Sequence, residues 1–262
     1  GVDFRGGAEI QVKFEEALPL EALRKSLKSG GFKNVSVQTI GEKGDNEFLV
    51  KVPGDEKNLN ALTESVGTAL KTGLAGNAPK VRKVDIVGPK AGASLRIAGF
   101  QAMGWALIVI MIYIGLRFDF KYSPGAIVAL FHDVSIILGI FAFTGTEFTL
   151  QTVAALLAVI GYSVNDTVVI YDRVREHEER EPDVGDLSVF INRAANETLS
   201  RTILTSGTTL FVGLSMYFYG GLAIRDFFFA ISLGVIVGTY SSIFVAAPVT
   251  LLFDTLKKKN EF

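Results

Sequence analysis

The stretch FTLQTVAALLAVIGYSVNDTVVIY, residues 148–171, holds a single charged side chain, Asp166, in an otherwise uncharged and largely apolar run. At about 1.5 Å per residue a helix of this length measures roughly 36 Å, which exceeds the roughly 30 Å hydrocarbon core of a bilayer. The run therefore predicts a transmembrane helix that carries a carboxyl group. Charges within spans are costly and mostly mark ion or proton paths, so Asp166 is the first candidate functional residue.

Four further apolar runs are long enough to span a bilayer. They are residues 97–116, 124–144, 202–219 and 227–253. With the first run they predict an α-helical transmembrane domain of five helices over residues 95–262. Lys and Arg gather after the first, third and last helix in chain order, which places the C-terminus in the cytoplasm. Residues 1–94 then lie on the opposite side, and we expect an earlier span to precede them.

The segment between the third and fourth spans, residues 186–201, has apolar residues at helical spacing with charges opposite them. This pattern predicts a cytoplasmic, interfacial amphipathic helix that leads into the next span.

The first 94 residues alternate between strand and helix patterns. Period-two alternation predicts strands, and helical spacing predicts two helices, the first starting at Pro19 and ending at Gly30. The strands are expected at residues 8–14, 33–41, 47–52 and 80–88, and the helices at 19–32 and 55–74. The β-α-β-β-α-β order predicts an α+β, ferredoxin-like extracytoplasmic domain with a four-stranded antiparallel sheet. A Gly-rich linker is expected over residues 88–96.

The composition excludes several classes of protein. The chain has 26 basic and 27 acidic residues and no cysteine, so neither a nucleic-acid partner nor a thiolate metal site is indicated. The only histidines, His132 and His177, lie on opposite sides of the predicted topology, and no nucleophile and base converge on either. We therefore expect no enzymatic activity, no metal and no cofactor.

A partner for Asp166 follows from depth in the membrane. Asp166 and Arg201 each lie 18 residues from the outer end of their antiparallel spans, so both lie about 27 Å below the outer boundary. An ion pair between them is geometrically possible, with Asn165 and Thr198 completing its hydrogen bonds. Loss of that pair would let the carboxyl group take up a proton. The alternatives are a permanent structural ion pair for Asp166 and a topology anchor for Arg201.

Three other features carry alternatives. Asp133, close to the midplane with His132 beside it, either extends a proton relay or only packs a helix. The stretch after Asp172, which includes His177, is interpreted as a solvated helix end. Gly234 and Gly238 stand in GxxxG register, which favours close helix packing over the lining of a polar path.

Five motifs resemble one protein family over the whole chain. They are GVDFRGG at 1–7, FHDV at 131–134, GYSVNDTVVIYDRVRE at 161–176, NETLSRTILTSGTTL at 196–210 and GVIVGTYSSIFVAAP at 234–248. Together they resemble the SecF branch of the SecD/SecF family of protein-export membrane proteins, within the RND superfamily. Members of this branch have six spans, so the resemblance implies that the first span is absent here.

The resemblance implies a function and site residues. It implies work with SecD and the SecYEG translocon, in which the proton-motive force helps to draw unfolded preproteins across the bacterial inner membrane. Asp166 and Arg201 match the positions that the family places in its proton pathway. The alternatives are a half-sized proton-driven exporter of small molecules and a non-conducting assembly subunit that only holds SecD.

Overall fold

The computed structural model describes residues 2–32, 35–40, 44–54, 59–74, 76–118, 121–182 and 186–260. The chain divides into two compact units. The first comprises residues 1–101, 147–150 and 218–225, and the second comprises residues 102–146, 151–217 and 226–262. The predicted boundary near residue 94 stays a prediction.

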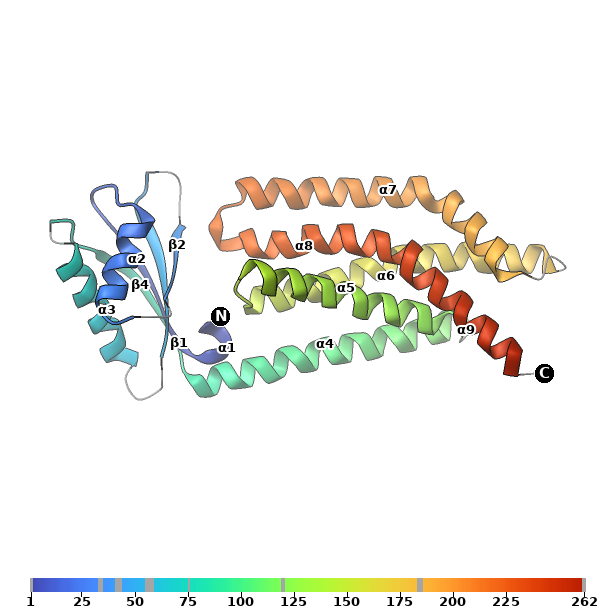
Figure 1. Cartoon of the computed structure of the whole chain (residues 1–262), viewed down its shortest axis with the longest axis horizontal. Helices are drawn as coiled ribbons and strands as arrows, with labels where there is room; N and C mark the ends of the chain where they lie inside the picture. The colour runs from blue at the N-terminus through green and yellow to red at the C-terminus, as the bar shows by residue number, and fades with distance from the viewer. Residues whose placement is uncertain are drawn as a thin grey trace. The chain divides into compact units, whose positions relative to one another are not determined.

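The first unit is built on a four-stranded sheet covered by two helices (Figure 1). Its elements are α1 (Val2–Arg5), β1 (Gly7–Lys13), α2 (Leu20–Ser29), β2 (Ser36–Ile40), β3 (Glu47–Pro53), α3 (Leu59–Gly73) and β4 (Lys80–Val87). The strand order is β2-β3-β1-β4, and every neighbouring pair is antiparallel. The predicted order of strands and helices is confirmed, although residues 33–34, 41 and 55–58 of the predicted elements lie outside the described residues. The short helix α1 was not expected.

The core of this unit lies between the helices and one face of the sheet. Alternate residues of β1, such as Ile10 and Val12, are buried against α2 and α3, which contribute Leu23, Leu27 and Leu70. Removing this apolar surface from water is the main stabilising term for a unit of this size. The period-two pattern of β1 is therefore the cause of its register, because a slip by one residue would expose the buried face.

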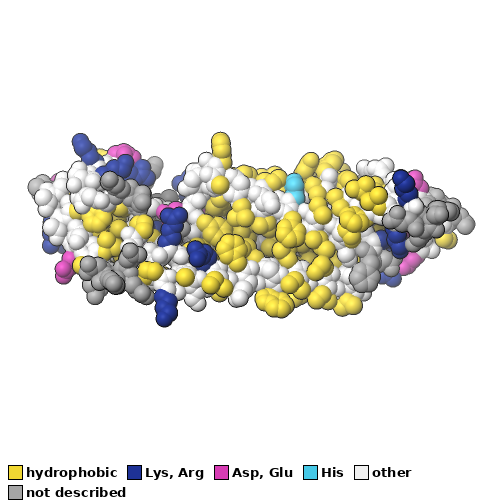
Figure 2. Space-filling view, turned by 60° about the horizontal axis from the view of Figure 1, so that its bottom comes forward, with side chains coloured by type: hydrophobic (Ala, Val, Ile, Leu, Met, Phe, Trp, Pro, Cys, Tyr) yellow, Lys and Arg dark blue, Asp and Glu magenta, His cyan; other side chains and the backbone are white. Residues whose placement is uncertain are grey.

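The second unit is mainly helical and holds most of the residues of the long helices of the chain (Figure 1). They are α4 (Pro89–Arg117), α5 (Ser123–Thr144), α6 (Leu150–Arg180), α7 (Leu187–Tyr219), α8 (Leu222–Ser241), a π-helical turn (Ser242–Ala246) and α9 (Ala247–Asn260). Hydrophobic side chains cover the face of this helical unit that Figure 2 shows. Such a surface is suited to lipid and not to water.

Among the described residues, four helical segments are long and apolar enough to cross a membrane. They are α4, α5, α6 and the continuous stretch Ile224–Lys257. Helix α7 covers the remaining predicted run, but five of the first eight residues of that run, 202–209, are Thr or Ser. Because of this polar content, α7 is less hydrophobic than the four segments above and is not counted with them. The count of five spans stays a prediction.

The stretch 88–96, predicted to be a Gly-rich linker between secondary-structure elements, is instead helical from Pro89. Helix α4 begins at Pro89 and continues without a break through this stretch. Proline at the first helical position has its φ preset for the helix and lacks an N–H that would be unpaired there anyway. Gly92 serves close packing, because a Cβ on it would lie 3.0 Å from the backbone nitrogen of Gly6.

The predicted amphipathic segment, residues 186–201, is helical from Leu187 and forms the first part of α7, and its cytoplasmic, interfacial position stays a prediction. Its apolar side chains Leu187, Phe190, Ile191 and Ala194 are buried in the same core as Tyr171 of α6. The apolar side is therefore covered by protein, and what remains for the membrane surface is the opposite side.

Candidate functional site

Small residues bring α6 and α8 into close contact. A Cβ on Gly234 would lie 2.1 Å from Val159, and one on Gly238 would lie 3.0 Å from the Ser163 Cβ. The predicted close packing at these glycines is confirmed. Because the two helices approach so closely, short hydroxyl side chains reach across the contact without water.

Asp133 on α5 is the best-connected polar group in this contact. Its residue is 1% exposed, and its Oδ2 accepts hydrogen bonds from Ser163 of α6 at 2.6 Å and from Ser241 of α8 at 2.9 Å. The Oδ1 atom lies 3.1 Å from Nδ1 of His132, a partly buried side chain on the same helix. Asp133 thus joins three helices through its two carboxyl oxygens.

Asp166 lies in a second polar cluster between α6, α7 and α8. It is 3% exposed, and its Oδ2 accepts a long hydrogen bond of 3.5 Å from Ser206 of α7. The Ser206 hydroxyl lies 2.6 Å from the Thr239 hydroxyl of α8 and accepts a hydrogen bond of 3.2 Å from Tyr162. The Asp166 carboxyl group therefore lies at the end of a hydrogen-bonded series of neutral hydroxyl groups.

A third set of hydroxyls continues along α6 beside the π-helical turn. Thr167 donates to the Ser242 hydroxyl at 3.0 Å, and the Tyr171 hydroxyl lies 2.8 Å from that of Thr250. Ser163, Thr167 and Tyr171 are four residues apart, so they share one face of α6. A π-turn inside a helix often occurs at a functional site, and this one separates α8 from α9 beside the polar face.

The structure does not join Arg201 to Asp166. Within the described part of the chain, no ion pair links the two side chains, and Arg201 is exposed whereas Asp166 is buried. Thr198 donates to the carbonyl of Ala194 on its own helix at 2.8 Å. Asn165 is exposed because adjacent helical residues point about 100° apart, so that only one of Asn165 and Asp166 faces the helix contact. The hydrogen bonds expected from Asn165 and Thr198 are therefore absent among the described residues.

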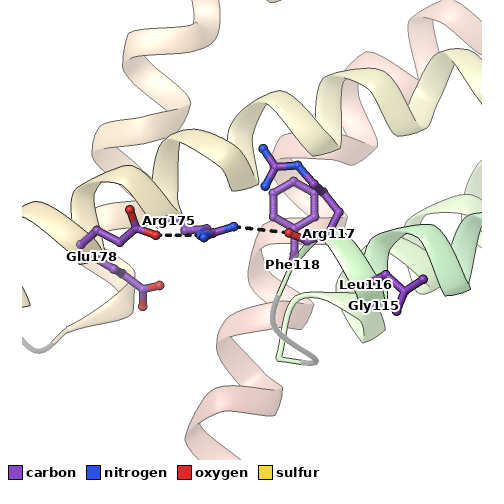
Figure 3. A pocket seen from close by; sticks show the side chains of 7 residues that line it. Gly115, Leu116, Arg117, Phe118, Arg175 and Glu178 are labelled. Atoms are coloured by element: carbon purple, nitrogen blue, oxygen red, sulfur yellow. Dashed lines mark hydrogen bonds and ion pairs between the residues drawn. The ribbon is translucent and has the colours of Figure 1, made fainter.

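The far end of α6 carries ion pairs to other helices. Arg117 of α4 pairs with Asp172 at 2.7 Å, and Lys121 pairs with Glu178 at 2.7 Å. Figure 3 shows Arg175 pointing from α6 toward Arg117, whose carbonyl oxygen it reaches at 3.4 Å. Arg117, Arg175 and Glu178 border an open cavity of about 590 Å³. Positive and negative side chains are paired here, so ion pairs fix this end of α6 to the neighbouring segments of the chain.

The interpretation of His177 as part of a solvated helix end is wrong. His177 is 6% exposed, stacks on Phe190 of α7, and lies 3.1 Å from an oxygen of Glu197. Arg173 also donates to Glu197, and this hydrogen bond, together with the weaker one to His177, lowers the pKa of the Glu197 carboxyl below its usual range. Sequence spacing predicted the helix but not the packing of α7 over its histidine.

No group of three or more metal-ligating side chains occurs within the described residues. What the second unit offers is two buried carboxyl groups, each bonded to hydroxyls from neighbouring helices. Ser163, Ser206 and Tyr162 were not predicted as site residues. Ser163 could have been found from the sequence, because hydroxyl side chains recur every four residues along α6, at positions 163, 167 and 171.

Comparison with known proteins bears on what this arrangement does. Residues 67–256 match the family described as protein export membrane protein SecD/SecF, C-terminal. The chain is 41% identical over 259 residues to the protein translocase subunit SecF of Vibrio alginolyticus, covering 98% of this chain and 81% of that one. It is 42% identical over 252 residues to the same subunit of Desulfurispirillum indicum, covering 94% and 79%. The chain belongs to the SecD/SecF family.

Solved structures of this family resemble the whole chain. The crystal structure of SecDF from Thermus thermophilus, a translocon-associated membrane protein, matches with a TM-score of 0.81 and 34% identity. It covers 97% of this chain, which corresponds to 34% of the SecDF chain. A crystal structure of SecDF in a super-membrane-facing form matches with a TM-score of 0.71. The resemblance drawn from the motifs is confirmed, and this member of the SecD/SecF family is a multi-pass inner-membrane protein of protein export.

Proposed function

We propose that this chain is the SecF-type subunit that uses the proton-motive force, together with SecD, to assist preprotein translocation through SecYEG. Its similarity to translocase subunits named SecF over nearly the full chain supports the role in translocation. Its likeness to SecDF structures supports SecD as the partner. The preprotein is then the substrate, and the lipid bilayer surrounds the apolar helices.

The proposal includes a topology. Five spans cross the membrane, residues 1–94 form a periplasmic ferredoxin-like domain, residues 95–262 form the transmembrane domain, and the C-terminus is cytoplasmic. The strand order β2-β3-β1-β4 with antiparallel neighbours supports the ferredoxin-like assignment. The basic residues at the ends of α4 and α9, including Arg117 and Lys257, support the orientation.

The observation that carries the proton coupling is the placement of Asp166. Its carboxyl group is buried within a predicted span and faces the hydroxyl of Ser206, which is linked to Thr239. A hydroxyl donates to a carboxylate and accepts from a carboxylic acid, because it is both donor and acceptor. The same neighbours therefore satisfy both protonation states, and one proton is gained or lost without leaving an unpaired buried group.

The other site residues have roles that follow from their positions. Asp133 has the same kind of surroundings, with two serine hydroxyls, and is the second proton-binding carboxyl group. Arg201 pairs with ionised Asp166 only after α7 has rotated, since its side chain is exposed in the present conformation. Asn165 is also exposed, and in this proposal it is available for contact with the partner subunit. Protonation of Asp166 thus selects between two packings of α6 against α7.

The energy available is adequate for such a change. One charge that crosses the field gains about 2.3 kcal/mol per 100 mV. A shift of 1.4 kcal/mol changes a two-state ratio about tenfold, so one or two protons reverse a modest preference for one helix packing.

The test is Asp166→Asn, which keeps the shape and the acceptor oxygen but removes the titrating proton. Asp172→Asn is the matched control, because Asp172 lies on the same helix and pairs with Arg117 at the exposed end. Preprotein export is measured in inverted membrane vesicles that contain SecD and SecYEG, with and without a proton gradient. We expect Asp166→Asn to lose most of the gradient-dependent increment and Asp172→Asn to keep it.

Two results would change the assignment. Equal gradient-dependent export by Asp166→Asn and the unaltered chain would remove the proton-coupling role. Loss of SecD on co-purification of Asp166→Asn would instead favour an assembly subunit, in which the carboxyl group only holds the complex together.

A further inference from the structure

The segment Asp3-Phe4-Arg5-Gly6-Gly7 near the start of the chain has no part in the proton site, yet it makes dense long-range contacts. All of them lie within the first compact unit, which includes residues 147–150 at the beginning of α6. We call residues 3–7 the joint segment. Its contacts reach the first residues of two long helices and the central strand β3 of the sheet.

The strongest contact is with the N-terminus of α6. Asp3 Oδ2 accepts a hydrogen bond of 3.0 Å from the backbone N–H of Leu150, the first residue of that helix. The first N–H groups of a helix have no partner within it, and a negative charge there is stabilised by the helix dipole. Such a cap normally comes from the residue just before the helix. Here it comes from a residue 147 positions away.

An aromatic contact supports the cap. The rings of Phe4 and Phe148 are stacked, with centroids 5.6 Å apart and planes 28° apart. Phe4 is buried. On the same side of the unit, Lys51 of β3 lies 3.2 Å from Glu9 and 3.9 Å from Glu147. The residues before α6 are therefore held by both the joint segment and the sheet.

The glycines of the joint segment fix it to α4 and to the sheet. Gly6 has φ +82°, a left-handed conformation that favours glycine, and a Cβ there would lie 2.6 Å from the nitrogen of Pro89. A Cβ on Gly7 would lie 2.2 Å from the carbonyl oxygen of Val52 in β3. Neither contact leaves room for a side chain, so the backbone of the joint segment packs directly against the start of α4 and against strand β3.

We infer that the joint segment is a rigid mechanical link, with Asp3 as the positioning residue that fixes the N-terminus of α6 to the sheet domain. Asp166 lies 16 residues after Leu150 on the same continuous helix, about 24 Å along it. A rotation or shift of α6 is then passed to the sheet domain through Asp3 and Phe4. The role of this link rests on the proposed function, whereas the contacts that form the link do not depend on it.

The test compares Asp3→Ala with Asp3→Asn in vesicles that contain SecD and SecYEG. Asn retains a cap oxygen and is as good a cap as Asp, whereas Ala has none. We expect Asp3→Ala to reduce the proton-gradient-dependent increment of export about fivefold, with Asp3→Asn close to the unaltered chain. Export measured without a proton gradient is expected to be the same in all three. A wild-type increment in Asp3→Ala at equal protein level would overturn the inference.

A second experiment does not depend on the folding of Asp3→Ala. These 262 residues contain no cysteine, so Phe4→Cys with Phe148→Cys supplies the only two thiols among them. A rigid link predicts that joining them with a short bismaleimide leaves gradient-dependent export intact. Loss of export on joining, when the two single-cysteine variants tolerate the reagent, would show that this contact opens and would overturn the inference.

Failure of the link and failure of the proton-coupling proposal are separable. If Asp166→Asn retains gradient-dependent export, the proton-coupling proposal fails whatever Asp3→Ala does. If Asp166→Asn loses that export and Asp3→Ala keeps it, only the mechanical link fails.

Discussion

Substitution of Gly234 by Ala tests the close packing of α6 against α8. The added Cβ would lie 2.1 Å, 2.5 Å and 2.9 Å from three carbons of the Val159 side chain. Carbon atoms pack best at roughly 3.5–4.0 Å, so the helices must separate or Val159 must leave its rotamer. Valine in a helix strongly prefers one χ1 angle, which blocks the second route. Overpacking of this kind costs about 1–3 kcal/mol.

The measurement is the free energy of unfolding in mixed detergent micelles, followed by circular dichroism as SDS is added. We expect Gly234→Ala to lower it by about 1–3 kcal/mol. Gly161→Ala is the matched control, because this helical glycine on α6 has nothing within 4 Å of the added Cβ. We expect no loss there, since Ala is the better helix former.

A double-mutant cycle makes the interpretation specific. Val159→Ala removes the two carbons closest to the new Cβ, so the variant with both substitutions should lose less than the sum of the two single losses. Strict additivity, or equal stability of Gly234→Ala and Gly161→Ala, would refute the claim that this contact sets the spacing of α6 and α8.

Two further predictions concern charged groups. Asp133→Leu should lower the free energy of unfolding by about 1–3 kcal/mol relative to Asp133→Asn, because it leaves the buried Ser163 hydroxyl without its acceptor; the same detergent titration measures this, and equal stability of the two variants would contradict it. The depressed pKa of Glu197 means that its contact with Arg173 stabilises the fold fully above the unfolded value of about 4.5 and is lost as the pH falls through the lower folded value. The rate of backbone amide hydrogen exchange at the start of α7 should rise as the pH falls through that range in the unaltered chain, but not in Glu197→Gln. Identical pH profiles of the two proteins would contradict this prediction.

Patterns with a fixed period were sufficient for much of the fold. The alternation in β1 and the helical spacing in α2 predicted both elements, because one buried face repeats every two or about 3.6 residues. The run at 88–96 was mispredicted as a linker because its glycine and proline are ambiguous without neighbours. Only the packing of Gly92 against Gly6 shows that glycine is needed there for close approach.

The candidate site was predicted in part. Asp133 and Asp166 were identified because a carboxyl group in an apolar run is costly, and both are buried in the structure. Their hydroxyl partners on other helices were largely missed, since serine and threonine are common in spans and carry no comparable signal. His177 was misinterpreted for the opposite reason, because its charged neighbours concealed that α7 buries it.

The sequence by itself determined the apolar runs, the order of the strands and helices, the position of the carboxyl groups along their helices and, through its motifs, the family. Only the tertiary structure decided which α7 residue faces Asp166. Counting residues gives depth along a helix but not rotation about its axis, and each residue turns the helix by about 100°. Ser206 follows Arg201 by five residues, roughly 7.5 Å along the helix and 140° around it. Ser206 therefore meets the carboxyl group, while Arg201 is exposed and forms no ion pair with it among the described residues.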